Sequence, residues 1–163
     1  GYKRQVLNKS AYDVTPVEWA KVINVNLNGE YYMASEFARY LKGKGKKGAI
    51  CNTASMSGHI VNWPQEQASY NASKAAVIQM TKSLAVEYCK DGIRVNCISP
   101  GYMYTELTCH VNPDWQERWM DLTPYGRYGT PDELCGAVIY LLSDSASFTS
   151  GTDIIVDGCF TCV

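Results

Sequence analysis

Residues 48–58 read Gly48-Ala49-Ile50-Cys51-Asn52-Thr53-Ala54-Ser55-Met56-Ser57-Gly58. The short apolar run passes into small hydroxyl residues and a glycine, which is typical of a buried parallel strand with polar side chains at its carboxyl end. Residues 93–101 repeat this design and end in Pro100-Gly101, and residues 153–158 predict a third strand. Because open α/β sheets bind ligands at the carboxyl ends of their strands, we expect a functional site at these strand tips.

Tyr70 and Lys74 follow the first of these strands, in a segment that predicts a helix from about residue 68 to residue 90. Side chains four residues apart project from the same face of a helix. An ammonium beside a phenol lowers the pKa of the tyrosine below its reference of about 10. Such a tyrosine can give a proton to a carbonyl oxygen or take one from an alcohol near neutral pH. The same spacing also occurs in ordinary helices.

Two capping boxes predict further helices. They are Thr15-Pro16-Val17-Glu18, which opens a helix to about residue 42, and Thr130-Pro131-Asp132-Glu133, which opens a helix to Leu142. Gly29 lies inside the first helix and is expected to mark close packing, since a helical glycine costs up to about 1 kcal/mol. The helix at 68–90 has a broad apolar stripe, which predicts that it is covered on two sides, and Gly92 is expected to end it; the stripe consists of Ala72, Ala76, Met80 and Leu84, widened by Ala75, Val77, Ile78 and Val86.

With these elements in order, the chain resembles a short-chain dehydrogenase/reductase. The matching segments are Val25-Asn26-Leu27-Asn28-Gly29, Asn52-Thr53-Ala54-Ser55 with Gly58, the run from Tyr70 to Lys74, Pro100-Gly101 with Thr105, and Val156-Asp157-Gly158. The stretches 55–65 and 149–153 look similar to the fungal and yeast carbonyl, sorbose and mannitol reductases of that family. The resemblance implies a single α/β domain over residues 1–163, which forms the C-terminal two thirds of a doubly wound, Rossmann-like parallel sheet with flanking helices.

The family's Gly-rich turn, on which the cofactor pyrophosphate binds, does not occur in this sequence. We therefore expect either that the chain is part of a longer protein or that it is a truncated product. Without the first half of the fold, the strand near Ile50 is expected to lack a neighbour and to expose a long apolar edge.

The resemblance also implies roles for individual residues. Tyr70 would be the general acid/base, and Lys74 would lower the pKa of that phenol and bind the nicotinamide ribose. Ser55 would hydrogen-bond the substrate oxygen as it gains negative charge, with Ser57 as the alternative. Asn26 resembles the asparagine that holds a water molecule on the lysine; otherwise it is a polar residue that kinks its helix.

The segment after the second strand would complete the site. Its residues Pro100, Gly101, Met103 and Thr105 would frame the nicotinamide, with helix capping as the alternative role of Thr105. In the family, residues 101–125 would be the substrate lid; the alternative is a surface loop that packs its own aromatic residues. Within this segment, Asn112-Pro113-Asp114 predicts the start of a short helix. Asn52 is expected to tie strand tips together.

These likenesses imply an oxidoreductase that transfers hydride between NADP(H) and a small carbonyl/alcohol or ketose/polyol substrate. NAD(H) is the alternative cofactor, because the family's selecting residues lie outside this sequence. The family's packing implies a homodimer or homotetramer. A second hypothesis is a truncated, inactive subunit-interaction module that binds no cofactor. A sugar-nucleotide epimerase shares the Tyr–Lys pair, but the chain after Gly101 is short for a nucleotide-sugar domain.

Composition argues against several kinds of partner and binding site. The 163 residues carry a net charge of -1, which argues against nucleic acid or an anionic membrane as partners. No apolar run approaches the roughly 18 residues of a membrane span. His59 and His110 share no metal-ligand spacing, so no metal site is expected, and both histidines are expected on the surface or in supporting positions. The basic run at residues 42–48 predicts a solvated turn.

The seven cysteines favour a reduced, cytoplasmic protein. Cys51 and Cys97 lie in predicted strands and are expected to be small buried apolar residues. Cys159 and Cys162 form a C-x-x-C pair, but the pair follows the last strand instead of opening a helix, which disfavours a redox role.

Overall fold

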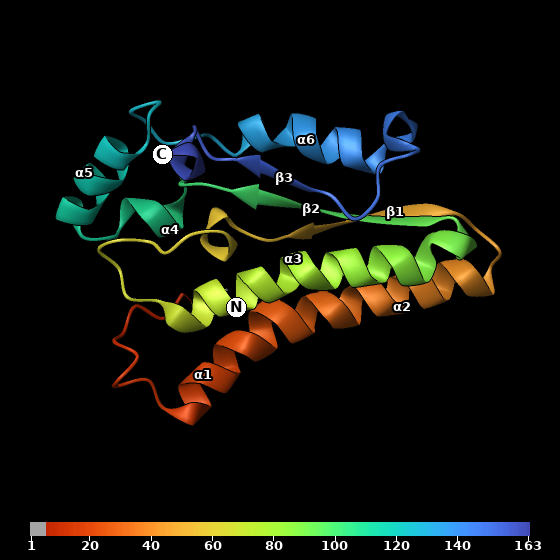
Figure 1. Ribbon diagram of the computed structural model, residues 1–163, viewed down its shortest axis with the longest axis horizontal. Coiled ribbons are helices and arrows are strands. Elements are labelled where there is room, and N and C mark those ends of the chain that lie inside the picture. Colours follow the sequence, from red (N-terminus) through yellow and green to blue (C-terminus); the bar gives the residue numbers. More distant parts are fainter. Residues whose placement is uncertain (1–5) are drawn as a thin grey trace.

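The computed structural model describes residues 6–163, apart from the side chain of Leu107. Its sheet has three parallel strands in the order β1 (Gly48–Thr53), β2 (Ile93–Pro100) and β3 (Asp153–Val156). Parallel neighbours need crossover connections, and here these connections place helices on both faces of the sheet (Figure 1). The predicted α/β class, with a Rossmann-like parallel sheet and flanking helices, is confirmed.

The two faces of the sheet are covered by different helices. In Figure 1, α2 (Gly29–Gly43) and α3 (Ala68–Tyr88) lie along one face, and α6 (Asp132–Leu142) lies along the other. Val77 of α3 and Val95 of β2 are both 0% exposed. Because α3 packs directly on the middle strand, the residues at its beginning have a fixed position relative to the strand ends.

Two short helices gather at the carboxyl ends of the strands. They are α4 (Glu106–Cys109) and α5 (Pro113–Leu122), and Figure 1 shows them close to the C-terminus of the chain. The predicted helix start at Asn112 is confirmed, since the Asn112 side chain accepts a hydrogen bond from the Asp114 N–H at 2.9 Å. Single 3₁₀ turns complete the fold, at Met56–Gly58, Cys89–Asp91, Asp144–Ala146 and Phe160–Cys162.

The capping box predicted at Thr15 is formed, and the one predicted at Thr130 is formed only in part. Glu18 accepts a hydrogen bond from the Thr15 N–H at 2.9 Å, the Thr15 side chain accepts one from the Glu18 N–H, and α1 (Pro16–Ile23) begins at Pro16. Glu133 accepts a hydrogen bond from the Thr130 N–H at 2.8 Å, but Pro131 is the N-cap of α6 and provides no side-chain cap. At the other end of α3, Gly92 adopts the left-handed backbone conformation with φ +72°, as expected of a residue that ends a helix.

The first predicted helix is not uniform. It divides into α1 (Pro16–Ile23), a π-helical turn at Asn24–Asn28, and α2. A Cβ atom on Gly29 would lie 3.6 Å from the Asn24 carbonyl oxygen, which is an ordinary contact, so the expectation of close packing at Gly29 is wrong. Single π turns inside helices occur frequently at functional sites, and this one contains Asn26.

The buried face of α3 also differs from the predicted stripe. Val77, Ile78 and Leu84 of the predicted set are buried, but Ala72, Ala75 and Val86 are exposed, and Ala76 and Met80 are half-buried. The face that meets the sheet is more polar, and it consists of Ser69, Ser73, Lys74, Val77, Ile78, Thr81, Leu84 and Ala85. Periodicity missed the polar members because their hydrogen bonds to other elements make burial acceptable.

Within residues 6–163, β1 pairs only with β2, so the predicted unpaired edge of β1 is confirmed for this part of the chain. The basic run continues from the end of α2 into an exposed turn before β1, as predicted. None of the helices in the described part of the chain has the combination of length and apolarity needed to cross a membrane.

The burial of each cysteine predicts its reactivity. Cys97 is buried, as expected, and burial raises the pKa of its thiol well above the usual range; Cys51 is only half-buried, against the expectation, and its partial burial raises its pKa to about 11. With a thiol reagent at pH 8 we expect rapid reaction of the exposed cysteines and reaction of Cys97 only after unfolding in guanidinium. The exposed group is Cys89, Cys135, Cys159 and Cys162. Rapid labelling of Cys97 in the folded protein, seen by mass spectrometry, would contradict its position.

Candidate active site

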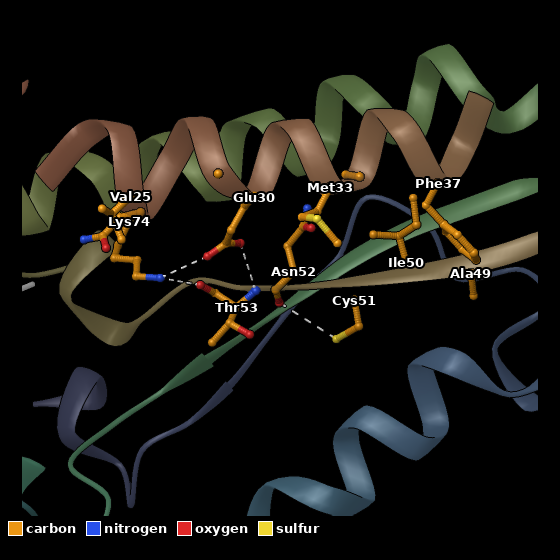
Figure 2. Close-up of a pocket in the computed structure, with 13 residues that line it drawn as sticks. Val25, Glu30, Met33, Phe37, Ala49, Ile50, Cys51, Asn52, Thr53 and Lys74 are labelled. Atoms are coloured by element: carbon orange, nitrogen blue, oxygen red, sulfur yellow. Dashed lines mark hydrogen bonds and ion pairs between the residues drawn. The ribbon is translucent and has the colours of Figure 1, made fainter. Parts of the chain in front are cut away.

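A cleft of about 420 Å³ runs along the unpaired edge of β1, between this strand and α2. Figure 2 shows that Phe37 and Ile50 form part of its apolar end. The polar end contains Glu30, Thr53 and Lys74, which come from α2, β1 and α3 (Figure 2). The cleft therefore joins apolar surface to a charged group at the carboxyl end of a strand.

Lys74 is deeply buried at this polar end, with a side chain that is only 4% exposed. Its Nζ donates a hydrogen bond to the Thr53 carbonyl oxygen at 2.5 Å and pairs with Glu30 Oε1 at 3.2 Å (Figure 2). A buried ammonium is tolerated only where such partners replace its water. The fold thus holds a positive charge in a defined place beside the end of β1.

Tyr70 lies one helical turn before Lys74 and is half-buried. Its carbonyl oxygen accepts a hydrogen bond from Ser73 Oγ at 2.7 Å. Its phenol lies within electrostatic range of Tyr102, whose pKa is raised to about 12, mainly by burial and to a smaller extent by Tyr128 and Tyr70. Tyr70 is therefore close enough to the segment that follows β2 to act on Tyr102.

Asn26 is joined to this pair through one intermediate residue. Its Nδ2 donates to Ser73 Oγ at 3.1 Å, and Ser73 in turn bonds the Tyr70 carbonyl. Asn26 lines the same cleft as Lys74 and is 2% exposed, and its Oδ1 is buried without a hydrogen-bond partner among the described residues. A buried acceptor of this kind is a suitable site for a water molecule or a polar ligand group.

Ser55 and Ser57 both lie at the tip of β1 and are both buried. Ser55 Oγ accepts a hydrogen bond from the Ser57 N–H at 3.2 Å, so Ser55 is the cap of the 3₁₀ turn at Met56–Gly58. Ser57 Oγ accepts a longer hydrogen bond, of 3.4 Å, from Gln67. Both hydroxyls lie at the carboxyl end of β1, so their positions fit the predicted serine role equally well.

The predicted nicotinamide frame lies at the carboxyl end of β2. Pro100 ends the strand, and the Gly101 N–H donates to the Val156 carbonyl at 2.9 Å. Met103 bridges to Gly129, and its carbonyl accepts from Thr108 Oγ1 at 2.6 Å. Thr105 is the N-cap of α4, so its alternative role as a helix cap is confirmed.

An amide cluster, which the sequence reasoning missed, connects the loop after β1 to this segment. It consists of Asn62, Gln65, Gln67 and Tyr102. The side-chain amides of Asn62 and Gln65 donate to the Tyr102 hydroxyl at 3.0 and 3.1 Å, and Gln67 donates to Asn62 Oδ1 at 2.9 Å. All three amide residues are buried. The three amides lie in a loop without periodicity, and Tyr102 follows Gln65 by 37 residues, so no local pattern identified the cluster.

The amide cluster also bears on the predicted lid. Trp119 of α5 is buried, stacks on Tyr102 with ring centroids 4.2 Å apart, and donates from Nε1 to Gln65 Oε1 at 2.7 Å. The segment 101–125 therefore packs its own aromatic residues, as the surface-loop alternative expected. It is also bonded to the loop that follows the serines, so α5 lies at the border of the candidate site.

His59 has a supporting position, in agreement with the expectation. Its Nε2 lies 2.6 Å from Asp153 Oδ2, and Ser99 Oγ donates to the same oxygen at 2.7 Å. These contacts join the loop after β1 to β2, through Ser99, and to β3, through Asp153. Asn52 differs from its expectation: its side chain donates to Thr81 Oγ1 at 2.9 Å, so it ties β1 to α3 and not to another strand tip.

Glu30 is the charged residue that the sequence analysis overlooked. It follows Asn26 by four residues, so both lie on one helix face, and this spacing was the available signal. Its pairing with Lys74 joins residues 44 positions apart in the chain. Among the described residues, no group of three or more histidine, cysteine, aspartate or glutamate side chains is placed to hold a metal ion.

Comparison with known proteins agrees with this geometry. The profile of the family described as enoyl-(acyl carrier protein) reductase matches residues 1–161. A sorbose reductase of Schizosaccharomyces pombe is 51% identical over 140 residues, which cover 86% of this chain and 54% of that protein. An NADP-dependent mannitol dehydrogenase of Hypocrea jecorina is 45% identical over 154 residues, which cover 94% of this chain and 57% of the relative.

Solved structures give the same result for the fold. A short-chain type dehydrogenase/reductase from Mycobacterium marinum is 42% identical with a TM-score of 0.92, over 97% of this chain and 62% of that one. A gluconate 5-dehydrogenase from Burkholderia cenocepacia, in complex with NADP and tartrate, is 31% identical with a TM-score of 0.91, over 99% and 63%. The chain thus spans little more than half the length of the two curated relatives, and it belongs to the short-chain dehydrogenase/reductase family.

Proposed function

We propose that the protein containing this chain is an NADP(H)-dependent oxidoreductase that interconverts a ketose, or another small carbonyl compound, and the corresponding polyol or alcohol. Tyr70 is its general acid/base. The names of the relatives, sorbose reductase and NADP-dependent mannitol dehydrogenase, support the substrate class. Since the chain spans little more than half of those relatives, the activity is proposed for the protein as a whole.

One observation carries this proposal: a buried ammonium lies one helical turn after a half-buried phenol, at the carboxyl end of a parallel strand. Burial weakens solvent screening, so the charge of Lys74 acts strongly on groups nearby. An ordinary surface lysine four residues after a tyrosine would be solvated and would have little such effect. The burial of Lys74 therefore favours catalysis over chance spacing.

The residues at this end of the sheet suit the nicotinamide and ribose part of the cofactor. Lys74 provides a cationic donor, Asn26 Oδ1 is a buried acceptor without a partner among the described residues, and Tyr70 provides a hydroxyl. Pro100 and Gly101 would face the nicotinamide from the tip of β2. When bound, the cofactor supplies or accepts the hydride.

The chain's own residues then handle the proton and the substrate oxygen. Tyr70 donates its phenolic proton to the carbonyl oxygen during reduction, and it accepts a proton from the alcohol during oxidation. Lys74 stabilises the phenolate that remains after donation. A serine at the tip of β1 donates a hydrogen bond to the oxygen as it gains charge.

A fluorescence titration with NADPH tests the proposal, followed by measurement of NADPH oxidation with sorbose and of NADP reduction with mannitol. We expect saturable binding and turnover of at least one of these substrates. A folded sample of the whole protein, verified by circular dichroism, that binds neither NADPH nor NADH would contradict the proposal and would favour the cofactor-free subunit-interaction module.

The two serines can be separated by substitution. We expect Ser55→Ala to lower kcat by about a hundredfold, the size of effect measured when one oxyanion donor is removed. Ser57→Ala is its matched control, and we expect a change in kcat of less than about fivefold, because Ser55, and not Ser57, keeps the Asn52-x-x-Ser spacing of the family. The reverse order of effects would assign the donor role to Ser57.

A further inference from the structure

Glu30 forms part of a closed group of three interactions around the end of β1. Its Oε1 pairs with Lys74 Nζ at 3.2 Å, and its Oε2 accepts a hydrogen bond from the Thr53 N–H at 3.2 Å. Lys74 Nζ completes the group by donating to the Thr53 carbonyl oxygen at 2.5 Å. Figure 2 shows these contacts between Glu30, Thr53 and Lys74.

This carboxylate lies in an unusual environment for a glutamate in a helix. Its side chain is 19% exposed and that of Lys74 is 4% exposed, whereas Glu36, six residues later in α2, is 68% exposed and pairs with Arg39 at the surface. Placing a charged carboxylate in such a site is unfavourable unless it has partners. Glu30 has both an ammonium and a backbone N–H, which satisfy its two oxygen atoms.

We propose that Glu30 is a positioning residue of this site, whose carboxylate holds the Lys74 ammonium against the end of β1. The proposal rests on the proposed function for its catalytic meaning, because the place of that ammonium decides how strongly it acts on Tyr70. The alternative is that Glu30 only caps the last peptide of an edge strand. In that case its bond to the Thr53 N–H would affect stability but not the chemistry of Lys74.

The two roles are separated by the rate at which acetic anhydride acetylates Lys74, measured by mass spectrometry at pH 8. Glu30→Gln keeps the size of the side chain and an oxygen that can accept from Thr53, but it removes the charge. Since loss of a neighbouring carboxylate favours the neutral, reactive amine, we expect acetylation to become faster by roughly tenfold. Glu36→Gln is the matched control in the same helix, and it should leave the rate unchanged.

Turnover provides a second measurement. We expect Glu30→Gln to lower kcat by about tenfold with less than a twofold change in the KM for the carbonyl substrate, the pattern of an interaction that matters in the transition state. Glu30→Asp keeps the charge on a shorter side chain and should recover part of kcat and part of the protection from acetylation. A merely structural Glu30 would instead leave kcat unchanged in every folded variant.

Equal acetylation rates of Lys74 in the unmodified protein and in Glu30→Gln would overturn the positioning role, whether or not turnover is observed. Absence of NADPH oxidation by the unmodified protein would contradict the proposed function, while the acetylation result would still decide the role of Glu30. If Glu30→Gln does not fold, the acetylation rates of Lys74 in Glu30→Asp and in the unmodified protein decide the role of Glu30. In the latter, Lys74 should react more slowly than the exposed Lys82 of the same helix, and equal rates would overturn the proposal.

Discussion

Replacement of Tyr70 by phenylalanine is expected to lower kcat by at least about a hundredfold while the melting temperature changes by no more than a few degrees. The substitution removes the hydroxyl that transfers the proton, and positioned acids and bases contribute roughly 10² to 10⁴ in rate. The aromatic ring remains. One of the contacts that Tyr70 makes, with Ser73, uses its backbone carbonyl, which the substitution does not change.

The measurement is NADPH oxidation at saturating ketose, together with thermal unfolding followed by circular dichroism. Tyr12→Phe is a matched control, because Tyr12 is 100% exposed and lies outside the cleft; its activity should equal that of the unmodified protein. If Tyr70→Phe keeps more than about a tenth of kcat, Tyr70 is not the proton donor. A large fall in melting temperature would instead attribute the loss to unfolding.

Replacement of Gly58 by alanine is expected to destabilise the protein by about 2 kcal/mol and to lower activity at the same time. A Cβ atom here would lie 2.9 Å from the Ala75 nitrogen and 2.9 Å from the Lys74 carbonyl carbon. Both are backbone atoms of α3 and cannot rotate away, so the loop or the helix must shift, and overpacking of this kind costs about 1–3 kcal/mol. The shift would move the serine loop relative to Lys74.

The free energy of unfolding in urea measures this effect, and α6 offers a control of opposite sign. Gly136 lies within that helix, and a Cβ atom there would have no neighbour within 4 Å. Gly136→Ala should therefore stabilise the protein by about 0.5–1 kcal/mol, because alanine loses less conformational entropy in a helix. Unchanged stability of Gly58→Ala would show that the loop after β1 does not pack tightly on α3.

Features that depend on a few neighbouring residues were predicted well. The strand at 48–53, the helix starts at Thr15 and Thr130 and the stop at Gly92 all follow from backbone preferences and capping within one or two turns. The stripe on α3 was predicted only in part. Alanine and methionine fit an apolar pattern, but Ser73 and Thr81 occupy the buried face because partners from distant segments satisfy their hydroxyls.

The amino-acid sequence was enough to place Tyr70 and Lys74 one turn apart on a common helix face. With 3.6 residues per turn, two side chains four positions apart must point in nearly the same direction from the helix axis. Only the folded chain reveals what surrounds that pair. Asn26 reaches Ser73 across 47 positions and Glu30 reaches Lys74 across 44. Local geometry says nothing about contacts over such separations. They arise because the crossover from α2 through β1 to α3 places these helices on one face of the sheet, where a buried ammonium requires a partner.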